Sequence, residues 1–243
     1  MNTKALFTFA LATLLSLSFT AQAASKLKVL VVTGGHGFEQ EPFFKVFKDN
    51  PNITYTSATQ AKSSEAYDRD DLLSYDVVVL YDMVQKITDA QKAKFLALFD
   101  KGVGVVITHH AMGSYQDWPE FERIRGGKYL LNEEKAGDKT WPKSDYQHDV
   151  DMPIQIVAKD HPITAGMKDF TIHDEVYSDF RVQPDVTPLI TTTHPKSGKP
   201  LAWCHEYGKS RVVFLQLGHD HAAYSKPGYQ QLLARSIQWA ANK

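Results

Sequence analysis

The chain contains a single cysteine, Cys204, among its 243 residues. One cysteine excludes an internal disulfide and a metal cage built from thiolates. The sequence also lacks an excess of either charge, because 27 lysines and arginines stand against 28 aspartates and glutamates, which gives a formal net charge of -1. Proteins that bind nucleic acids usually rely on a strongly basic surface. We therefore expect no nucleic-acid partner.

Several motifs of nucleotide and hydrolytic chemistry are missing as well. The sequence has no Gly-x-Gly-x-x-Gly fingerprint, no P-loop, no Gly-x-Ser-x-Gly elbow and no His-Glu-x-x-His helix. These motifs supply the phosphate cradles, nucleophiles and zinc ligands of large enzyme classes. Their absence predicts that the protein uses no nucleotide cofactor and is neither a serine hydrolase of the elbow type nor a zinc protease of the helix type.

Residues 1–23 have the composition of an export signal. A lysine at position 4 precedes an apolar run from Ala5 to Phe19, and Ala21-Gln22-Ala23 follows. A charged start, a short apolar stretch and a small-x-small site are the three parts of a secretory signal peptide. The apolar run is too short for a comfortable membrane span. We expect cleavage before Ala24, no membrane span, and a periplasmic or secreted domain over residues 24–243.

The remaining sequence alternates between buried strands and amphipathic helices. A Thr-x-x-Gln capping box at Thr88 and Gln91 begins one helix, and Gly102 is suited to end it. Continuous apolar runs are typical of strands that are covered on both faces. Strands are expected at 27–33, 53–58, 76–82, 103–108, 154–158, 188–193, 201–206 and 211–218, and helices at 39–47, 88–102 and 229–241. The pattern predicts one α/β domain with a doubly wound, mostly parallel sheet.

Residues 113–150 interrupt this alternation. They are polar and aromatic, contain glycine, and follow no clean period. Long irregular insertions within compact domains usually have a functional role. We expect this segment to be irregular in structure and to contribute to function.

Histidines follow three of the predicted strands. His36 comes after the first strand, His109 and His110 after the strand at 103–108, and His219 after the last. The carboxyl ends of parallel strands share one edge, where ligands of open α/β sheets bind. The segment 173–181 adds carboxylates to the candidates. Because neighbouring strand residues point to opposite faces, at most one of His109 and His110, and one of the adjacent carboxylates, should face a given site. The alternative is that His109 and His110 have only a structural role, in packing and in the hydrogen bonds of the turn.

Several motifs together resemble one known family. They are "VLVVTGGHGFE", "HHAMG", "DHPITAGMKDFTIHDEVY", "PLAW", "YGKSRVVFLQLGH" and "SIQWAA". Over residues 27–241 the sequence is similar to the ThuA-like domain, named for trehalose utilisation. The resemblance implies a flavodoxin-like fold of the class I glutamine amidotransferase-like type. In amidotransferases the turn after a central strand carries a nucleophilic cysteine, whereas this chain has Thr108-His109-His110-Ala111 there. Because Cys204 lies far along the chain, we do not expect thiol-based glutamine hydrolysis.

The resemblance also implies a chemistry and a set of residues. Relatives are associated with sugars oxidised at carbon 3, which implies elimination, hydration or isomerisation of 3-keto-glycosides. Family motifs are matched by His110, His219 and the Asp-Glu-x-Tyr segment. His36 lies in the N-terminal glycine turn, where the position of the histidine varies among relatives. Many relatives carry a histidine near residue 127, and this chain has none there. Either His148 takes over its role, or the role is unfilled. The expected catalytic residues are His110, Glu175, His219, His36 and Tyr177, and the expected substrate-binding residues are Asp174, Arg181, His109 and Trp118.

Two questions stay open at this stage. The histidines suit either proton transfer or the binding of a divalent metal, zinc or manganese, with His110, His219 and Glu175 as ligands. The partner expected is a small sugar, and a homo-oligomer is left open. The competing interpretation is a carbohydrate-binding protein without catalysis, built on an amidotransferase-like scaffold that lacks the nucleophilic cysteine.

The export signal yields a direct prediction. If residues 1–23 are removed on export, N-terminal sequencing of the protein from its native host should begin at Ala24. Recovery of a soluble cytoplasmic form that still begins with Met1 would contradict this prediction.

Overall fold

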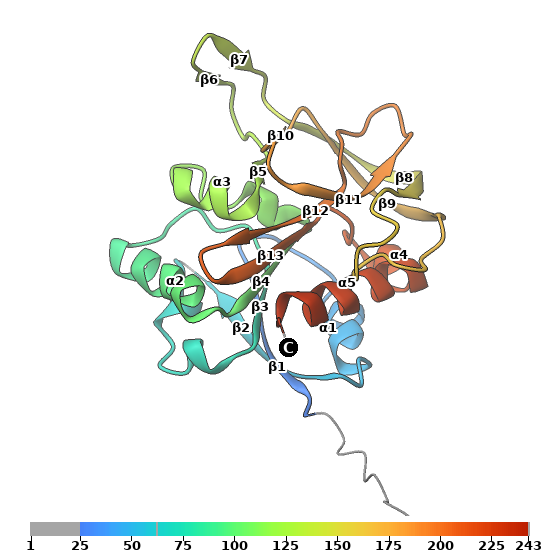
Figure 1. Cartoon of the computed structure of the whole chain (residues 1–243). Helices are drawn as coiled ribbons and strands as arrows, with labels where there is room; N and C mark the ends of the chain where they lie inside the picture. The colour runs from blue at the N-terminus through green and yellow to red at the C-terminus, as the bar shows by residue number, and fades with distance from the viewer. Residues whose placement is uncertain (1–24, 62, 243) are drawn as a thin grey trace, which may run out of the picture.

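The computed structural model describes residues 25–61 and 63–242, so the predicted signal peptide lies outside the described residues. A nine-stranded sheet with the order β2-β1-β3-β4-β13-β12-β11-β8-β9 runs through the domain (Figure 1). Two small antiparallel pairs, β10-β5 and β6-β7, accompany it. Within the described ranges, no helix combines the length and apolar character needed to cross a membrane.

The elements follow one another along the chain with these bounds: β1 Leu27–Gly34, α1 Gln40–Lys48, β2 Ile53–Gln60, β3 Val77–Asp82, α2 Asp89–Lys101, β4 Gly104–Thr108, α3 Pro119–Arg125, β5 Gly127–Lys128, β6 Glu134–Ala136, β7 Lys139–Trp141, β8 Asp145–Ile156, β9 Phe170–Ser178, β10 Arg181–Val182, β11 Thr187–Thr192, β12 Ala202–Tyr207, β13 Ser210–Leu215, α4 His221–Tyr224 and α5 Pro227–Ala240. Short 3-10 helices cover Glu65–Asp68, Leu72–Ser74 and His109–Gly113.

The first five strands of the sheet order are parallel and form the doubly wound half. Along β1, Val29 and Val31 join the core on one face, while Leu30 and Val32 join the core on the other. Helices α1 and α5 cover the first face, and α2 and α3 cover the second (Figure 1). Burial on both faces explains why these strands are continuously apolar. The predicted flavodoxin-like α/β fold is confirmed.

Local signals in the sequence also correspond to observed helix ends. At the start of α2, the Thr88 side chain accepts a hydrogen bond from the backbone N–H of Gln91, and the Gln91 side chain caps the backbone of Thr88 in return. Gly102 ends the helix in the left-handed conformation with φ of 84°. Both ends therefore satisfy backbone groups that the helix itself leaves unpaired.

The second half of the sheet is antiparallel and corrects one expectation. The irregular insertion predicted over 113–150 is wrong as a structural description, because that range contains α3, β5, β6, β7 and the start of β8. The segment 173–181, interpreted only as polar, begins within β9. Strand β8 pairs with β9 over most of its length, with a bulge between Gln147 and Val150. The second half of β8 alternates apolar and polar residues, with Val150, Met152, Ile154 and Ile156 buried, whereas its polar first half is a strand through its pairing with β9.

The capping box predicts a measurable contribution to stability. Replacing Thr88 with Ala removes the hydroxyl that accepts from Gln91 N, so the free energy of unfolding should fall by about 0.5–2 kcal/mol. Urea denaturation measures this loss. Thr88→Ser keeps the hydroxyl and should retain most of the stability. Equal stability of the Ala and Ser variants would show that the cap contributes nothing.

Candidate active site

A cavity of about 260 Å³ opens at the carboxyl edge of the parallel strands. It lies where His36 follows β1 and Met83 follows β3, which is the point at which the strand order reverses, and where α/β sheets commonly bind ligands. Strands β8 and β9 form another part of its wall. The lining residues are His36, Met83, His110, Gly113, Tyr129, Leu131, Lys143, Tyr146, His148, Glu175 and Tyr177.

Two glycines let the chain leave β1 and bring His36 to the cavity. Gly34 and Gly35 have φ angles of 127° and 75°. A Cβ atom at Gly34 would lie 2.2 Å from the carbonyl oxygen of Gln60, so no larger residue fits between the neighbouring backbones. The His36 ring then rests 4.5 Å, centroid to centroid, from the ring of His110.

The chain turns sharply after β4, at His109. This residue is fully buried and holds a φ of 49°, a left-handed conformation that only a few per cent of non-glycine residues adopt. The His109 Nδ1 atom lies 2.7 Å from the carbonyl oxygen of Gln216. Because a carbonyl oxygen only accepts, Nδ1 carries a hydrogen and donates it. The Nε2 atom therefore faces the opposite side of the ring.

Three polar side chains converge on His109 Nε2. Glu175 Oε2 lies 3.0 Å away, and His219 Nδ1 and Tyr177 Oη each lie 3.1 Å away. The same Glu175 oxygen is 3.3 Å from His219 Nδ1. The ligand atoms of His109, Glu175 and His219 thus form one compact group that could hold a metal ion. It draws on β4, β9 and the segment after β13.

Asp174 fixes the segment that carries His219 and does not line the cavity. Its two carboxylate oxygens accept hydrogen bonds from the backbone N–H groups of Gly218 and His219, at 2.8 and 2.9 Å. Burial raises the pKa of this carboxyl, and His109 and the backbone donors oppose the rise. Of the two adjacent carboxylates on β9, only Glu175 reaches the cavity wall.

His110 lines the cavity as a buried, neutral imidazole. Its Nε2 atom donates to the carbonyl oxygen of Tyr81 at 3.3 Å, so Nδ1 holds a lone pair. That buried Nδ1 atom has no hydrogen-bond partner among the described residues. Burial, together with the nearby His109 and His36, lowers the pKa of His110 well below its usual value.

The charges of the cluster are set by neighbours as well as by burial. Burial raises the pKa of Glu175, but hydrogen bonds with His109 and His219 outweigh it and hold this pKa well below its usual range. Its hydrogen bond with Glu175 raises the pKa of His219. Burial raises the pKa of Tyr177 well above 10, so its hydroxyl keeps its hydrogen. The carboxylate of Glu175 is therefore negative at neutral pH.

His148 joins the same cluster from the bulge in β8. Its Nδ1 atom is 3.3 Å from Glu175 Oε1, and its ring lies 4.6 Å from that of His219. Tyr129, Lys143 and Tyr146 also come from the segment 113–150 and line the cavity. Sequence reasoning assigned that segment a functional role without identifying these three, because only the pairing of β8 with β9 brings them to the cavity.

None of the four residues expected to bind substrate lines the cavity. His109 and Asp174 are buried in the cluster and its support, and the other two lie elsewhere. Arg181 makes a two-pronged ion pair with Glu122, at 2.9 and 2.8 Å, and a further contact of 2.9 Å with Glu134. Trp118 packs beside Phe95 and Phe121 at the start of α3. Cys204 is buried in β12, and burial raises the pKa of its thiol to about 12, so it offers no reactive thiolate.

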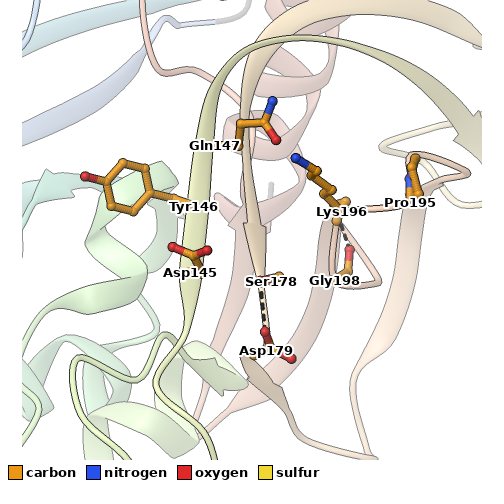
Figure 2. Close-up of a pocket in the computed structure, with 9 residues that line it drawn as sticks. Asp145, Tyr146, Gln147, Ser178, Asp179, Pro195, Lys196 and Gly198 are labelled. Carbon is orange, nitrogen blue, oxygen red and sulfur yellow. Dashed lines mark hydrogen bonds between the residues drawn. The ribbon is translucent and has the colours of Figure 1, made fainter.

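A second, larger cavity of about 750 Å³ lies between β8, β9 and residues 195–198. Figure 2 shows the Tyr146 ring turned away from Lys196 and Pro195, toward the other side of β8. Tyr146 lines both cavities. Of the cluster, Glu175 and His148 line the smaller cavity alone, and His109 and His219 line neither. The smaller cavity, which combines a buried lone pair with a charged cluster, is the stronger candidate for chemistry.

Comparison with solved structures identifies proteins of the same fold. A ThuA-like protein from Parabacteroides merdae ATCC 43184 is 23% identical, with 89% of this chain and 90% of that chain covered and a TM-score of 0.73. A ThuA-like protein from Bacteroides uniformis ATCC 8492 is 18% identical, with 92% and 95% covered and a TM-score of 0.67. No curated protein sequence matches significantly. The sequence profile of the ThuA family, described as trehalose utilisation, matches residues 28–240, and the chain therefore belongs to this family.

Proposed function

We propose that the protein is an exported enzyme that acts on 3-keto-glycosides or related oxidised sugars by acid–base elimination, hydration or isomerisation. The observation that carries the proposal is the buried Nδ1 atom of His110, a residue of the cavity wall, because this atom has no partner among the described residues. An unpaired buried acceptor is costly and calls for a reason, and a waiting proton acceptor is one. Membership of the ThuA family supports a sugar as substrate.

The chemistry requires one base and one acid. A ketone at carbon 3 makes the hydrogen on carbon 2 acidic, and His110 Nδ1 accepts that proton. The C–H electron pair forms a double bond between carbons 1 and 2, and the bond from carbon 1 to the glycosidic oxygen breaks. His36, exposed beside His110 at the cavity mouth, protonates the departing oxygen. Addition of water to the double bond completes hydration.

The lining of the cavity suits one sugar ring. Tyr129 and Tyr146 provide aromatic surface, and 55% of Tyr146 is exposed, which is unusual for so large a side chain. His36, Lys143 and His148 supply polar groups around them. Small-molecule sites combine apolar walls with a few polar groups, and their volumes run from about 300 Å³ upward. A cavity near the lower end fits a single ring better than an oligosaccharide.

Substitution of His110 tests its role as the base. The purified protein is incubated with a methyl 3-keto-glucoside in D₂O, while NMR follows exchange at carbon 2 and mass spectrometry follows products. We expect His110→Ala to lower both rates by about 10²–10⁴, the usual cost of losing a general acid or base. The melting temperature should change little.

His173→Ala is the matched control, because His173 is an exposed histidine on β9 that does not line the cavity. It should keep the wild-type rates. Methyl glucoside, which lacks the ketone, should show no exchange. Saturable binding of either sugar by the wild-type protein without exchange or product would overturn the proposal in favour of a carbohydrate-binding protein.

A further inference from the structure

We propose that His109 Nε2, Glu175 Oε2 and His219 Nδ1 are the protein ligands of one divalent transition-metal ion, of the zinc or manganese class. The role given below to the ion rests on the proposed function, whereas the ligand set rests on geometry alone. Of the two histidines after β4, the ligand is thus His109 rather than His110. Two nitrogens and one carboxylate oxygen form a donor set that catalytic zinc sites use.

The first argument is the spacing of the three atoms. They lie 3.0, 3.1 and 3.3 Å from one another. A triangle of these sides has its corners about 1.8 Å from its centre, so an ion about 1 Å above the plane stands about 2.1 Å from each, the usual zinc–ligand distance. The three atoms therefore need little rearrangement to bind one ion.

The second argument is the direction in which the His109 ring faces. Its Nδ1 atom donates to the carbonyl oxygen of Gln216, so Nε2 is the ring nitrogen left to bind an ion. Nε2 faces the two other proposed ligand atoms, Glu175 Oε2 and His219 Nδ1, at 3.0 and 3.1 Å. The three donor atoms therefore already point to one place.

The third argument is the support behind each ligand. The Gln216 carbonyl orients the His109 ring, the Asp174 carboxylate holds the backbone of His219, and His148 contacts the second oxygen of Glu175. Metal sites typically show such outer partners, which fix the direction of each ligand. Each of the three proposed ligands thus has an outer partner that orients it.

Within the proposed function, the ion has a defined task. Removal of the proton from carbon 2 leaves negative charge on the oxygen at carbon 3. A cation held by His109, Glu175 and His219 would stabilise that charge, and Glu175 is the ligand of the three that lines the cavity. His110 would remain free as the base.

Metal binding can be measured without any substrate. The purified protein is stripped with a chelator and titrated with Zn²⁺, Mn²⁺ and Co²⁺, with calorimetry for affinity, elemental analysis for stoichiometry and visible absorption of Co²⁺ for the ligand field. We expect one ion per chain. Glu175→Gln and His219→Ala should each weaken binding at least about 100-fold, since loss of an outer partner alone costs about 10–100-fold.

His173→Ala is again the control, because His173 with Asp149 and Asp151 is an exposed cluster that could bind metal adventitiously. It should leave binding unchanged. Absence of binding by the wild-type protein, binding that Glu175→Gln leaves intact, or binding lost in His173→Ala would each overturn the inference. If a variant fails to fold, the Co²⁺ spectrum of the wild-type protein decides, because it must show mixed nitrogen and oxygen ligation. Binding without turnover would refute the proposed function and leave the ligand set standing. Turnover by a metal-free protein would refute the task given to the ion and leave the proposed function standing.

Discussion

The hydrogen bond from His109 Nδ1 to the carbonyl oxygen of Gln216 organises the polar site. At 2.7 Å it links the end of β4 to the segment after β13, the neighbouring strand of the parallel sheet. It fixes the side of the His109 ring that faces Glu175, His219 and Tyr177. Because this carbonyl occupies Nδ1, Nε2 is the ring nitrogen that meets the other three side chains.

The site lies where the two halves of the sheet meet in space. The parallel half brings histidines to its carboxyl edge by the general geometry of doubly wound folds. The antiparallel half brings Glu175 from β9 and His148 from β8. Asp174 joins the halves, because its carboxylate on β9 holds the backbone of Gly218 and His219 after β13. Displacement of β9 would therefore disturb the carboxylate and a histidine of the cluster together.

The parallel half could be predicted from sequence because its signals are local. Continuous apolar runs indicate strands that are buried on both faces. The capping box at Thr88 indicates a helix start, and the structure has α2 begin there. The antiparallel half is predictable only in part. The apolar runs of β11, β12 and the end of β8 indicate strands, whereas the start of β8 and much of β9 are polar and become strands by pairing with each other. The same limit applies to Arg181, an expected substrate-binding residue. The fold places Glu122 and Glu134 beside it, and no local pattern reveals partners so distant in sequence.

The turn after β4 holds a strained backbone position at the cluster. His109 has a φ of 49° there. Strained backbone of this kind costs about 1–3 kcal/mol and persists only where the surroundings hold it in place. Here the surroundings are the Gln216 carbonyl on one side of the ring and the Glu175, His219 and Tyr177 groups on the other. The turn directs His109 inward to that cluster and leaves the next residue, His110, at the cavity wall, so that one sharp turn supplies both a buried anchor and the proposed base.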